Sequence, residues 1–283
     1  MRFVRQIIVL IGLLGLPVQP SLAAALEPAP IRVGLLPTIA PLSLLRLYDP
    51  LRIHLQKQLG RPVELYSAPN FRAYLQDIEV GTFDVVISAP HFGVVALDGG
   101  YVPLARYKLD LSPLIIVPKG SQIKRVRQLA GKRVLTADRL SALSVVAEHW
   151  LMSDAAMRAG RDYSLIEASN HATAIRAVAM GDAEAAFSGL SPLQQVPAEI
   201  RAKVDSIPCP LVVPHQFTMA HPRLGAGTVE KLRAALAGFA DTEEGRAFFK
   251  ASGFLGFVPL EIAEIESIRP YAQIVRSMTR EKE

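Results

Sequence analysis

The sequence contains almost none of the motifs that bind metals, bind nucleotides or cleave bonds. Among its 283 residues there is one cysteine, Cys209, so the chain cannot form an intrachain disulfide. Its six histidines show no H-E-x-x-H pattern and no cluster with cysteine, and there is no G-x-S-x-G, P-loop or G-x-G-x-x-G motif. We therefore expect a protein that is not an enzyme, with no metal and no cofactor.

The sequence also lacks a block of charge of one sign. Lys and Arg total 31 against 26 Asp and Glu, which gives a formal net charge of +5. Because no arginine-rich tract is present, we expect no nucleic-acid partner.

Beyond the first 25 residues there is no apolar run long enough to cross a membrane. Arg2 and Arg5 precede an apolar run at residues 7–16, and three alanines at 23–25 supply an A-x-A cleavage site. A run of about ten residues is too short to span a bilayer. We interpret residues 1–25 as a cleavable signal peptide and expect a periplasmic protein; a retained amphipathic anchor is the alternative.

What the sequence does contain is an alternation of short apolar runs and helical periodicity, which predicts an α/β protein. In a first region, strands are expected at 31–37, 62–68 and 83–89, and helices at 42–60 and 71–81. A second region repeats this order, with strands at 132–137, 162–168 and 183–189, and helices at 141–157 and 172–181. The β-α-β-α-β order predicts a parallel core in each region, with right-handed crossovers.

One short phrase occurs twice, one hundred residues apart. "VGTFDVVISAP" starts at Val80 and "MGDAEAAFSGL" at Met180, so that Gly81 matches Gly181, Asp84 matches Glu184 and Ser88 matches Ser188. Two explanations stay open: a sequence pattern common to βαβ units in general, and a true internal duplication. In either case, both serines are expected at the carboxyl ends of parallel strands, where open α/β sheets bind ligands.

The connections predict two lobes joined by a hinge. Extended, proline-containing segments lead from the first region to the second and back again. We assign residues 26–110 and 215–283 to lobe 1 and residues 111–214 to lobe 2. The helical residues 225–283 are expected to pack on lobe 1. Two crossings between lobes allow the lobes to close on a ligand by hinge bending.

At this point the chain resembles a known family. "NFRAYLQDIEVGTFDVVISAPHF", from Asn70, and "SNHATAIRAVAMGDAEAAFSG", from Ser169, are similar to segments of the phosphate/phosphite/phosphonate-type substrate-binding proteins of ABC transporters. The resemblance extends over about residues 31–260. It implies the fold of a type II periplasmic binding protein, with two lobes and a parallel core in each sheet.

The resemblance implies a ligand site whose residues have partly changed. A Ser-Thr-Ser run that binds phosphonate oxygens in the family corresponds here to Ser141, Ala142 and Leu143, and the family histidine is retained as His171. Positions that carry other contacts in the family are occupied by different residues. Two tyrosines correspond to Phe71 and Ser88, an acidic residue corresponds to Ser191, and an aspartate falls near His215 or Gln216.

The residues around these positions suit a small anion. The turn at 138–144 offers free backbone N–H groups and the positive end of a helix dipole, and Arg139 adds a charge. His171, at a helix start, is expected to act as a neutral donor. Each residue also has a simpler interpretation: a serine cap for Ser141, a solvated cation for Arg139, a structural role for His171. The expected ligand-binding residues are Thr38, Phe71, Ser88, His91, Arg139, Ser141, Ala142, His171, Ser188, Ser191, His215 and Gln216.

The function expected from these features is capture of a small oxyanion and its delivery to an ABC permease by a monomeric protein. In one alternative, the closed form is read by a membrane sensor kinase, including one that senses arsenic oxyanions. A second and less favoured alternative is an enzyme on the same fold. Cys209 is interpreted as a buried thiol, with a soft-ligand role as the alternative.

Overall fold

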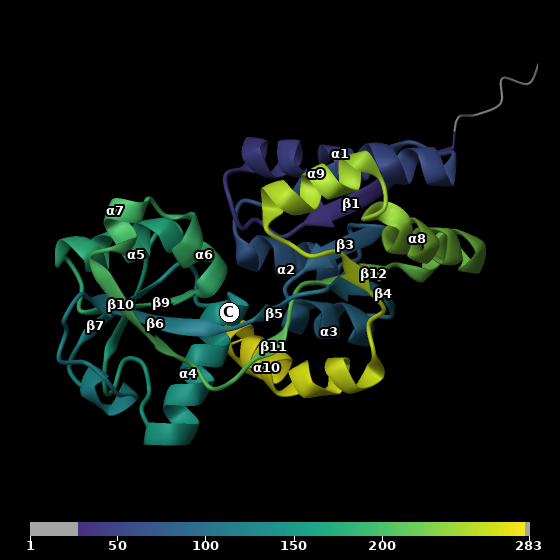
Figure 1. Cartoon of the computed structure of the whole chain (residues 1–283). Helices are drawn as coiled ribbons and strands as arrows, with labels where there is room; N and C mark the ends of the chain where they lie inside the picture. Colours follow the sequence, from purple (N-terminus) through teal and green to yellow (C-terminus); the bar gives the residue numbers. More distant parts are fainter. Residues whose placement is uncertain (1–27, 281–283) are drawn as a thin grey trace, which may run out of the picture.

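The computed structural model describes residues 28–280, so the predicted signal peptide lies outside the described residues. Two separate β-sheets, each with helices on both faces, form two lobes that are visible side by side in Figure 1. Between them lies a third, two-stranded sheet. The α/β class and the two-lobed architecture predicted from the sequence are both present.

Lobe 1 is built on a six-stranded mixed sheet of order β13-β4-β12-β3-β1-β2. The parallel core predicted from the first region is formed by β1, with β2 and β3 on either side of it. The remaining pairings are antiparallel: β12 lies between β3 and β4, and β13 pairs with the outer side of β4. The strands are β1 Ile31–Leu35, β2 Val63–Ser67, β3 Val85–Ser88, β4 Val102–Tyr107, β12 Phe217–Ala220 and β13 Phe257–Val258.

The helices of lobe 1 cover both faces of this sheet. On one face, α1, α8 and α9 pack over an apolar cluster that includes Leu51, Leu232 and Phe248. On the other face lie α2, α3 and α10. The helices are α1 Pro41–Leu59, α2 Phe71–Glu79, α3 Pro90–Asp98, α8 Ala226–Phe239, α9 Glu243–Ser252 and α10 Ile262–Arg280, with a 3₁₀ turn η2 at Pro222–Leu224.

Lobe 2 repeats the plan on a five-stranded sheet of order β10-β6-β9-β7-β8. Its parallel core is β9-β7-β8; β6 pairs antiparallel with β9, and β10 pairs antiparallel with β6 at the edge. The strands are β6 Pro113–Pro118, β7 Arg133–Thr136, β8 Ser164–Glu167, β9 Ala185–Gly189 and β10 Val204–Pro208. The helices are η1 Val126–Leu129, α4 Ala142–Ala155, α5 His171–Met180, α6 Leu190–Gln195 and α7 Ala198–Arg201.

The chain crosses between the lobes through a two-stranded antiparallel sheet. It pairs β5, at Asp110–Leu111, with β11, at Val213–Pro214. The lobe boundaries predicted after residues 110 and 214 fall within this pair. Each crossing then supplies the antiparallel strand that flanks a lobe's parallel core, namely β6 in lobe 2 and β12 in lobe 1.

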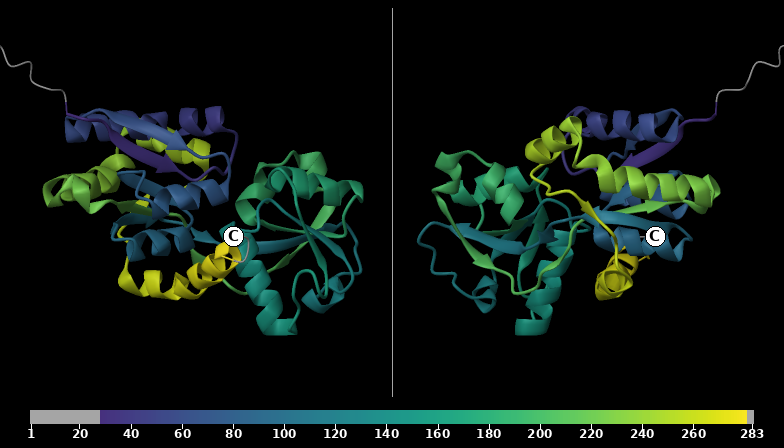
Figure 2. Two further views of the ribbon diagram at one scale, coloured as in Figure 1. Left: turned by 180° about the vertical axis from the view of Figure 1, so that it is seen from behind. Right: turned by 45° about the vertical axis from the view of Figure 1, so that its right-hand side comes forward.

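The C-terminal helix α10 is in contact with both lobes. The prediction placed all of residues 225–283 on lobe 1, and α8 and α9 do pack there against α1. Helix α10 packs on α3 of lobe 1 and also reaches α4 of lobe 2 (Figure 2). There Tyr271 meets the ring of His149 edge to face, with 5.3 Å between ring centroids. The helical pattern of residues 262–280 does not reveal this bridge, because it depends on how α10 packs against α4.

Candidate ligand-binding site

Two helices of lobe 2 start at the same edge of its sheet. Strands β7 and β8 run parallel, so their carboxyl ends lie together, and α4 and α5 follow them directly. A backbone hydrogen bond of 2.7 Å from Ala168 N to Thr136 O joins the two strand ends. The positive ends of two helix dipoles therefore point to one region.

The start of α4 is fixed by buried hydroxyl groups. As predicted, Ser141 is the N-cap, and its Oγ accepts a 3.2 Å hydrogen bond from the N–H of Ser144. The Ser144 hydroxyl in turn contacts Ser141 Oγ and the Asp138 carbonyl, both at 2.7 Å, and also Thr136 Oγ1. Sequence reasoning missed the role of Ser144. The N–H groups of Ala142 and Leu143 belong to the first turn, which has no intrahelical acceptors for them.

His171 begins α5, directly after its N-cap Asn170. Burial lowers the pKa of His171 to about 4, although the Phe187 backbone acts in the opposite direction. The imidazole is therefore neutral at pH 7, as the sequence analysis expected. Its Nδ1 lies 3.4 Å from Oγ of Ser188, which is fully buried at the end of β9.

The end of β9 also lies against the start of α4. A Cβ placed on Gly189 would lie 3.0 Å from the methyl groups of Leu143, so the two chain segments are in close contact there. The structure thus brings together the predicted residues Ser141, Ala142, His171 and Ser188. We refer to these four residues together with Leu143 as the lobe 2 site. Ser191 is half-buried in α6, the helix that follows β9.

Arg139 forms an ion pair within lobe 2. Its Nη2 lies 3.3 Å from Glu148 Oε2 on α4, and its backbone N–H donates to Glu167 Oε1 at 3.0 Å. Burial raises the pKa of Glu148, and the nearby guanidinium opposes that effect. Among the described residues, Arg139 Nε and Glu148 Oε1 are buried without a hydrogen-bond partner. The sequence did not reveal Glu148 as the partner of Arg139.

The predicted residues after β1 and β3 of lobe 1 differ in exposure. Thr38 is exposed in the turn before α1. Phe71 begins α2 and packs edge to face on Phe92, with 6.3 Å between ring centroids. Ser88 is fully buried, and its hydroxyl lies 3.3 Å from the carbonyl of Ala89.

His91 lies within helix α3. Pro90 at the first helical position starts α3, which the sequence analysis did not predict. The His91 ring is 1% exposed, and its Nε2 lies 2.9 Å from the carbonyl oxygen of Leu140 in lobe 2.

His215 and Gln216 lie where the returning chain enters lobe 1. The His215 ring packs against Tyr107 and Phe254. Burial, together with nearby Arg106, lowers its pKa to about 4. His215 Nδ1 and Gln216 Oε1 are buried and have no hydrogen-bond partner among residues 28–280.

Cys209 is a free, buried thiol just before β11. Its Sγ accepts a hydrogen bond from the N–H of Leu211 at 3.4 Å, and burial raises the pKa of the thiol. Burial thus favours the protonated thiol, which matches the interpretation of Cys209 as a buried thiol. Within the described part of the chain, no group of three or more His, Cys, Asp or Glu side chains could hold a metal ion. Nor is any helix there long and apolar enough to cross a membrane.

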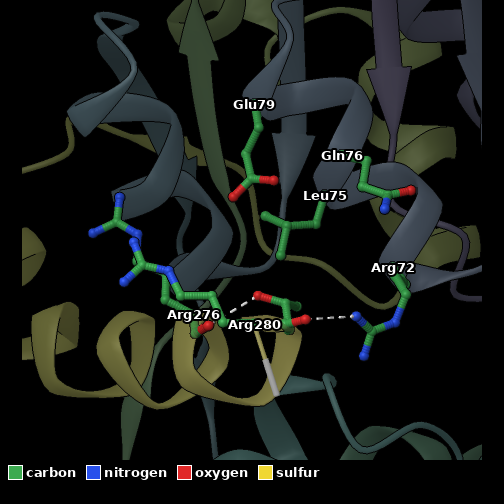
Figure 3. Close-up of a pocket in the computed structure, with 7 residues that line it drawn as sticks. Arg72, Leu75, Gln76, Glu79, Arg276 and Arg280 are labelled. Carbon is green, nitrogen blue, oxygen red and sulfur yellow. Dashed lines mark hydrogen bonds between the residues drawn. The ribbon is translucent and has the colours of Figure 1, made fainter. Parts of the chain in front are cut away.

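A pocket of about 220 Å³ lies between α2 and α10, and it does not include the predicted site residues. In Figure 3, Arg276 and Arg280 extend to one side, Arg72 lies on the other, and Glu79 points into the space between them. Arg72 donates to the Thr279 carbonyl at 3.5 Å and Arg276 to Asp98 at 2.8 Å. Because these guanidinium groups do not converge, we assign no ligand to this pocket. A second pocket of about 300 Å³ lies between α1 and α8.

Comparison with known proteins identifies the family and the fold. A family model described as "ABC transporter, phosphonate, periplasmic substrate-binding protein" matches residues 33–265. Among solved structures, PhnD1 of Prochlorococcus marinus in complex with methylphosphonate is 15% identical, with a TM-score of 0.73 over 87% of this chain and 98% of that one. A binding protein component of a Pseudomonas aeruginosa ABC phosphonate transporter is 16% identical, with a TM-score of 0.74 over 85% and 84%.

A more distant match is the alkanesulfonate-binding protein SsuA of Xanthomonas axonopodis pv. citri bound to MOPS. It is 19% identical, with a TM-score of 0.58 over 89% of this chain and 94% of that one. At such identities the structures support the fold alone. Together with the family model, they confirm the two-lobed type II periplasmic binding fold that the resemblance implied.

Proposed function

This chain belongs to the ABC-transporter family of periplasmic phosphonate substrate-binding proteins, and from that premise we propose that it captures a small oxyanion between its lobes for an ABC permease. Members of this family bind solutes rather than transform them. The observation that carries the proposal is the lobe 2 site, in which the starts of α4 and α5 meet the end of β9.

The charges around the lobe 2 site favour an oxyanion with a single negative charge. His171 is neutral, because burial lowers its pKa to about 4. The nearby cation, Arg139, is paired with Glu148. What remains for a ligand is hydroxyl groups, an imidazole and backbone N–H groups at helix starts, which carry partial charges. Alkylsulfonates and singly ionised alkylphosphonates match this donor set better than a dianion does.

Lobe 1 supplies the opposing surface in this proposal. Thr38, Phe71 and Gln216 follow or flank the carboxyl ends of its strands, as Ser188 and Ser191 do in lobe 2. A ligand that contacts both surfaces stabilises the closed arrangement by its differential affinity for that arrangement. The two-stranded β5–β11 sheet is the natural axis for this motion. The sensor-kinase alternative uses the same capture step and stays a prediction.

The test is a thermal-shift panel on the protein without residues 1–25. It contains methylphosphonate, 2-aminoethylphosphonate, methanesulfonate, phosphate, phosphite, sulfate and arsenite, each matched in ionic strength with sodium chloride. A ligand at about one hundred times its Kd adds about 2.7 kcal/mol to the unfolding free energy. For a chain of this size, we expect the melting temperature to rise by about 5–10 °C. A flat response across the panel would contradict capture of an oxyanion.

A matched pair of variants locates the binding. Ala142→Asp places a carboxylate at the first position of α4, where it occupies the anion's place and repels the ligand. Ala198→Asp makes the same change at the first position of α7, which lies elsewhere in lobe 2. We expect the first variant to lose the thermal shift and the second to keep it. Retention of the shift in Ala142→Asp would place the ligand elsewhere.

A further inference from the structure

One buried hydrogen bond joins the two lobes close to the lobe 2 site. His91 is the second residue of α3 in lobe 1, and its Nε2 lies 2.9 Å from the carbonyl oxygen of Leu140 in lobe 2. Both residues are buried, with exposed fractions of 1% and 5%. Since a carbonyl only accepts hydrogen bonds, Nε2 carries the hydrogen and donates it.

Leu140 is the residue immediately before the N-cap of α4. Its own N–H donates to Asp138 Oδ1 at 2.7 Å, and the N–H of Ser141 donates to the Asp138 carbonyl at 3.1 Å. The turn that leads into the lobe 2 site is therefore held from inside lobe 2 by Asp138 and from lobe 1 by His91. Because this hydrogen bond joins the two lobes, movement of one lobe relative to the other must stretch or break it.

The surroundings of His91 favour a fixed ring. Phe92 meets the imidazole edge to face, with 4.6 Å between ring centroids. Burial lowers the pKa of His91 to about 4, so the ring stays neutral at pH 7 even though the Leu140 carbonyl acts in the opposite direction. Breaking the bond leaves a buried N–H and a buried C=O without partners, which makes it costly unless water enters.

We propose that His91 is an interlobe positioning residue, whose hydrogen bond to Leu140 sets the angle between the lobes and holds the start of α4 in place for the ligand. Its importance for binding rests on the proposed function; its control of the interlobe angle does not. His91 was expected to contact the ligand directly. The geometry assigns its donor to the protein backbone instead.

The protein contains a matched control for this bond. His54 on α1 places its Nε2 2.9 Å from the carbonyl of Ala235 on α8, and its ring packs on Phe239 at 5.0 Å. The chemistry is the same as at His91, but both partners belong to lobe 1. Removal of this bond should affect stability without changing the angle between the lobes.

The experiment measures the distance between spin labels on the two lobes of the ligand-free protein. Labels are attached through Lys57→Cys on α1 and Glu199→Cys on α7, both exposed positions, while Cys209 stays buried and unlabelled. The variants His91→Phe, His91→Gln and His54→Phe are added to this background. Circular dichroism and melting temperatures show whether each variant is folded.

We expect His91→Phe to broaden the interlobe distance distribution and shift it to longer distances. His91→Gln, whose amide nitrogen takes the place of Nε2, should restore the narrow distribution. His54→Phe should lower the melting temperature but keep the parental distances. If His91→Phe does not fold, His91→Asn replaces it, because its shorter amide does not reach Leu140.

Two results would overturn the proposal: unchanged distances when the His91 donor is lost, or an equal broadening in His54→Phe. Addition of methylphosphonate to the parent protein separates this question from the proposed function. If the interlobe distances of the parent protein do not change with methylphosphonate or the other anions of the panel, the proposed function is weakened. The role of His91 is still decided by the ligand-free distances.

Discussion

The two lobes share a scaffold down to single hydrogen bonds, yet they present different side chains to a ligand. Asn70 caps α2 and Asn170 caps α5, each by accepting a 2.9 Å hydrogen bond from the third helical residue. Asp84 accepts from the N–H of Arg32 at 2.8 Å, and Glu184 accepts from the N–H of Arg133 at 2.9 Å. The repeated phrase therefore occupies equivalent structural positions in the two lobes, and both explanations of its origin, common βαβ patterning and duplication, stay open.

The lobes differ at the residue that begins the equivalent helix. In lobe 1 it is Phe71, which packs on Phe92; in lobe 2 it is His171, which lies beside Ser188. The equivalent strand ends are Ser88 and Ser188. The Ser88 hydroxyl contacts the carbonyl of the next residue, Ala89, whereas the Ser188 hydroxyl contacts the His171 ring. A repeated scaffold thus carries an apolar surface on one lobe and hydrogen-bond donors on the other.

The largest effect we expect is a loss of folding stability at acidic pH. Burial lowers the pKa of His91 and His215 in lobe 1 and of His171 in lobe 2 to about 4, against about 6.5 in an unfolded chain. Between these values the unfolded chain binds protons that the folded chain excludes, so stability is complete above pH 6.5 and is lost as the pH falls toward 4. At pH 5 each imidazole should cost about 2 kcal/mol.

Urea unfolding at pH 7.5, 6 and 5 measures this loss. His171→Phe should reduce this pH dependence, because it removes one of the imidazoles whose protonation burial opposes. The same stability at pH 7.5 and pH 5 would show that these histidines are not held neutral by burial.

A second comparison sets Asp84 against Glu184. Asp84 is 7% exposed and also receives a 2.6 Å hydrogen bond from Arg223 Nε, a contact with no equivalent in lobe 2. Burial opposes ionisation of Asp84, but these hydrogen bonds lower its pKa. We expect Asp84→Ala to cost about 1–3 kcal/mol of unfolding free energy, because it leaves the partly buried N–H of Arg32 and the guanidinium of Arg223 without this partner.

Glu184→Ala should cost less than about 1 kcal/mol, because its side chain is 40% exposed and water replaces the lost contact. Urea unfolding of both variants at pH 7.5 gives the difference. Equal losses of unfolding free energy in the two variants would mean that the Arg223 contact does not stabilise the protein.

The smallest effect we expect is on ligand affinity, which should depend more on His171 in lobe 2 than on Phe71 in lobe 1. His171→Phe gives lobe 2 the residue of lobe 1 and removes a donor, so the Kd for the best anion of the panel should rise about tenfold, or about 1.4 kcal/mol. Phe71→Leu, in lobe 1, keeps an apolar surface and should change the Kd much less. Calorimetric titration measures both. A larger effect of Phe71→Leu would reverse the assignment of roles to the lobes.

The sequence predicted the local elements well, because their signals lie within a few neighbouring residues. Gly60 and Gly181 end α1 and α5 in left-handed conformation, and Ser141 caps α4, as expected. Helix α3 was missed because its apolar segment follows the strand β3 without a break, and its seven buried residues give no amphipathic period. Strand ends and family motifs placed Ser141, Ala142, His171 and Ser188 among the expected ligand-binding residues, and their contact with a ligand stays a prediction.

The sequence by itself therefore determined the two βαβ cores, their caps and the family. Only the tertiary structure decided which partner each charged or polar group takes. From the sequence, Arg139 is a free cation beside a helix start, but in the structure Glu148 on α4 pairs with it. His91 reads as a ligand contact until the two lobes bring Leu140 to its ring. Periodicity and capping depend on residues a few positions apart, whereas these pairings depend on how separate elements pack.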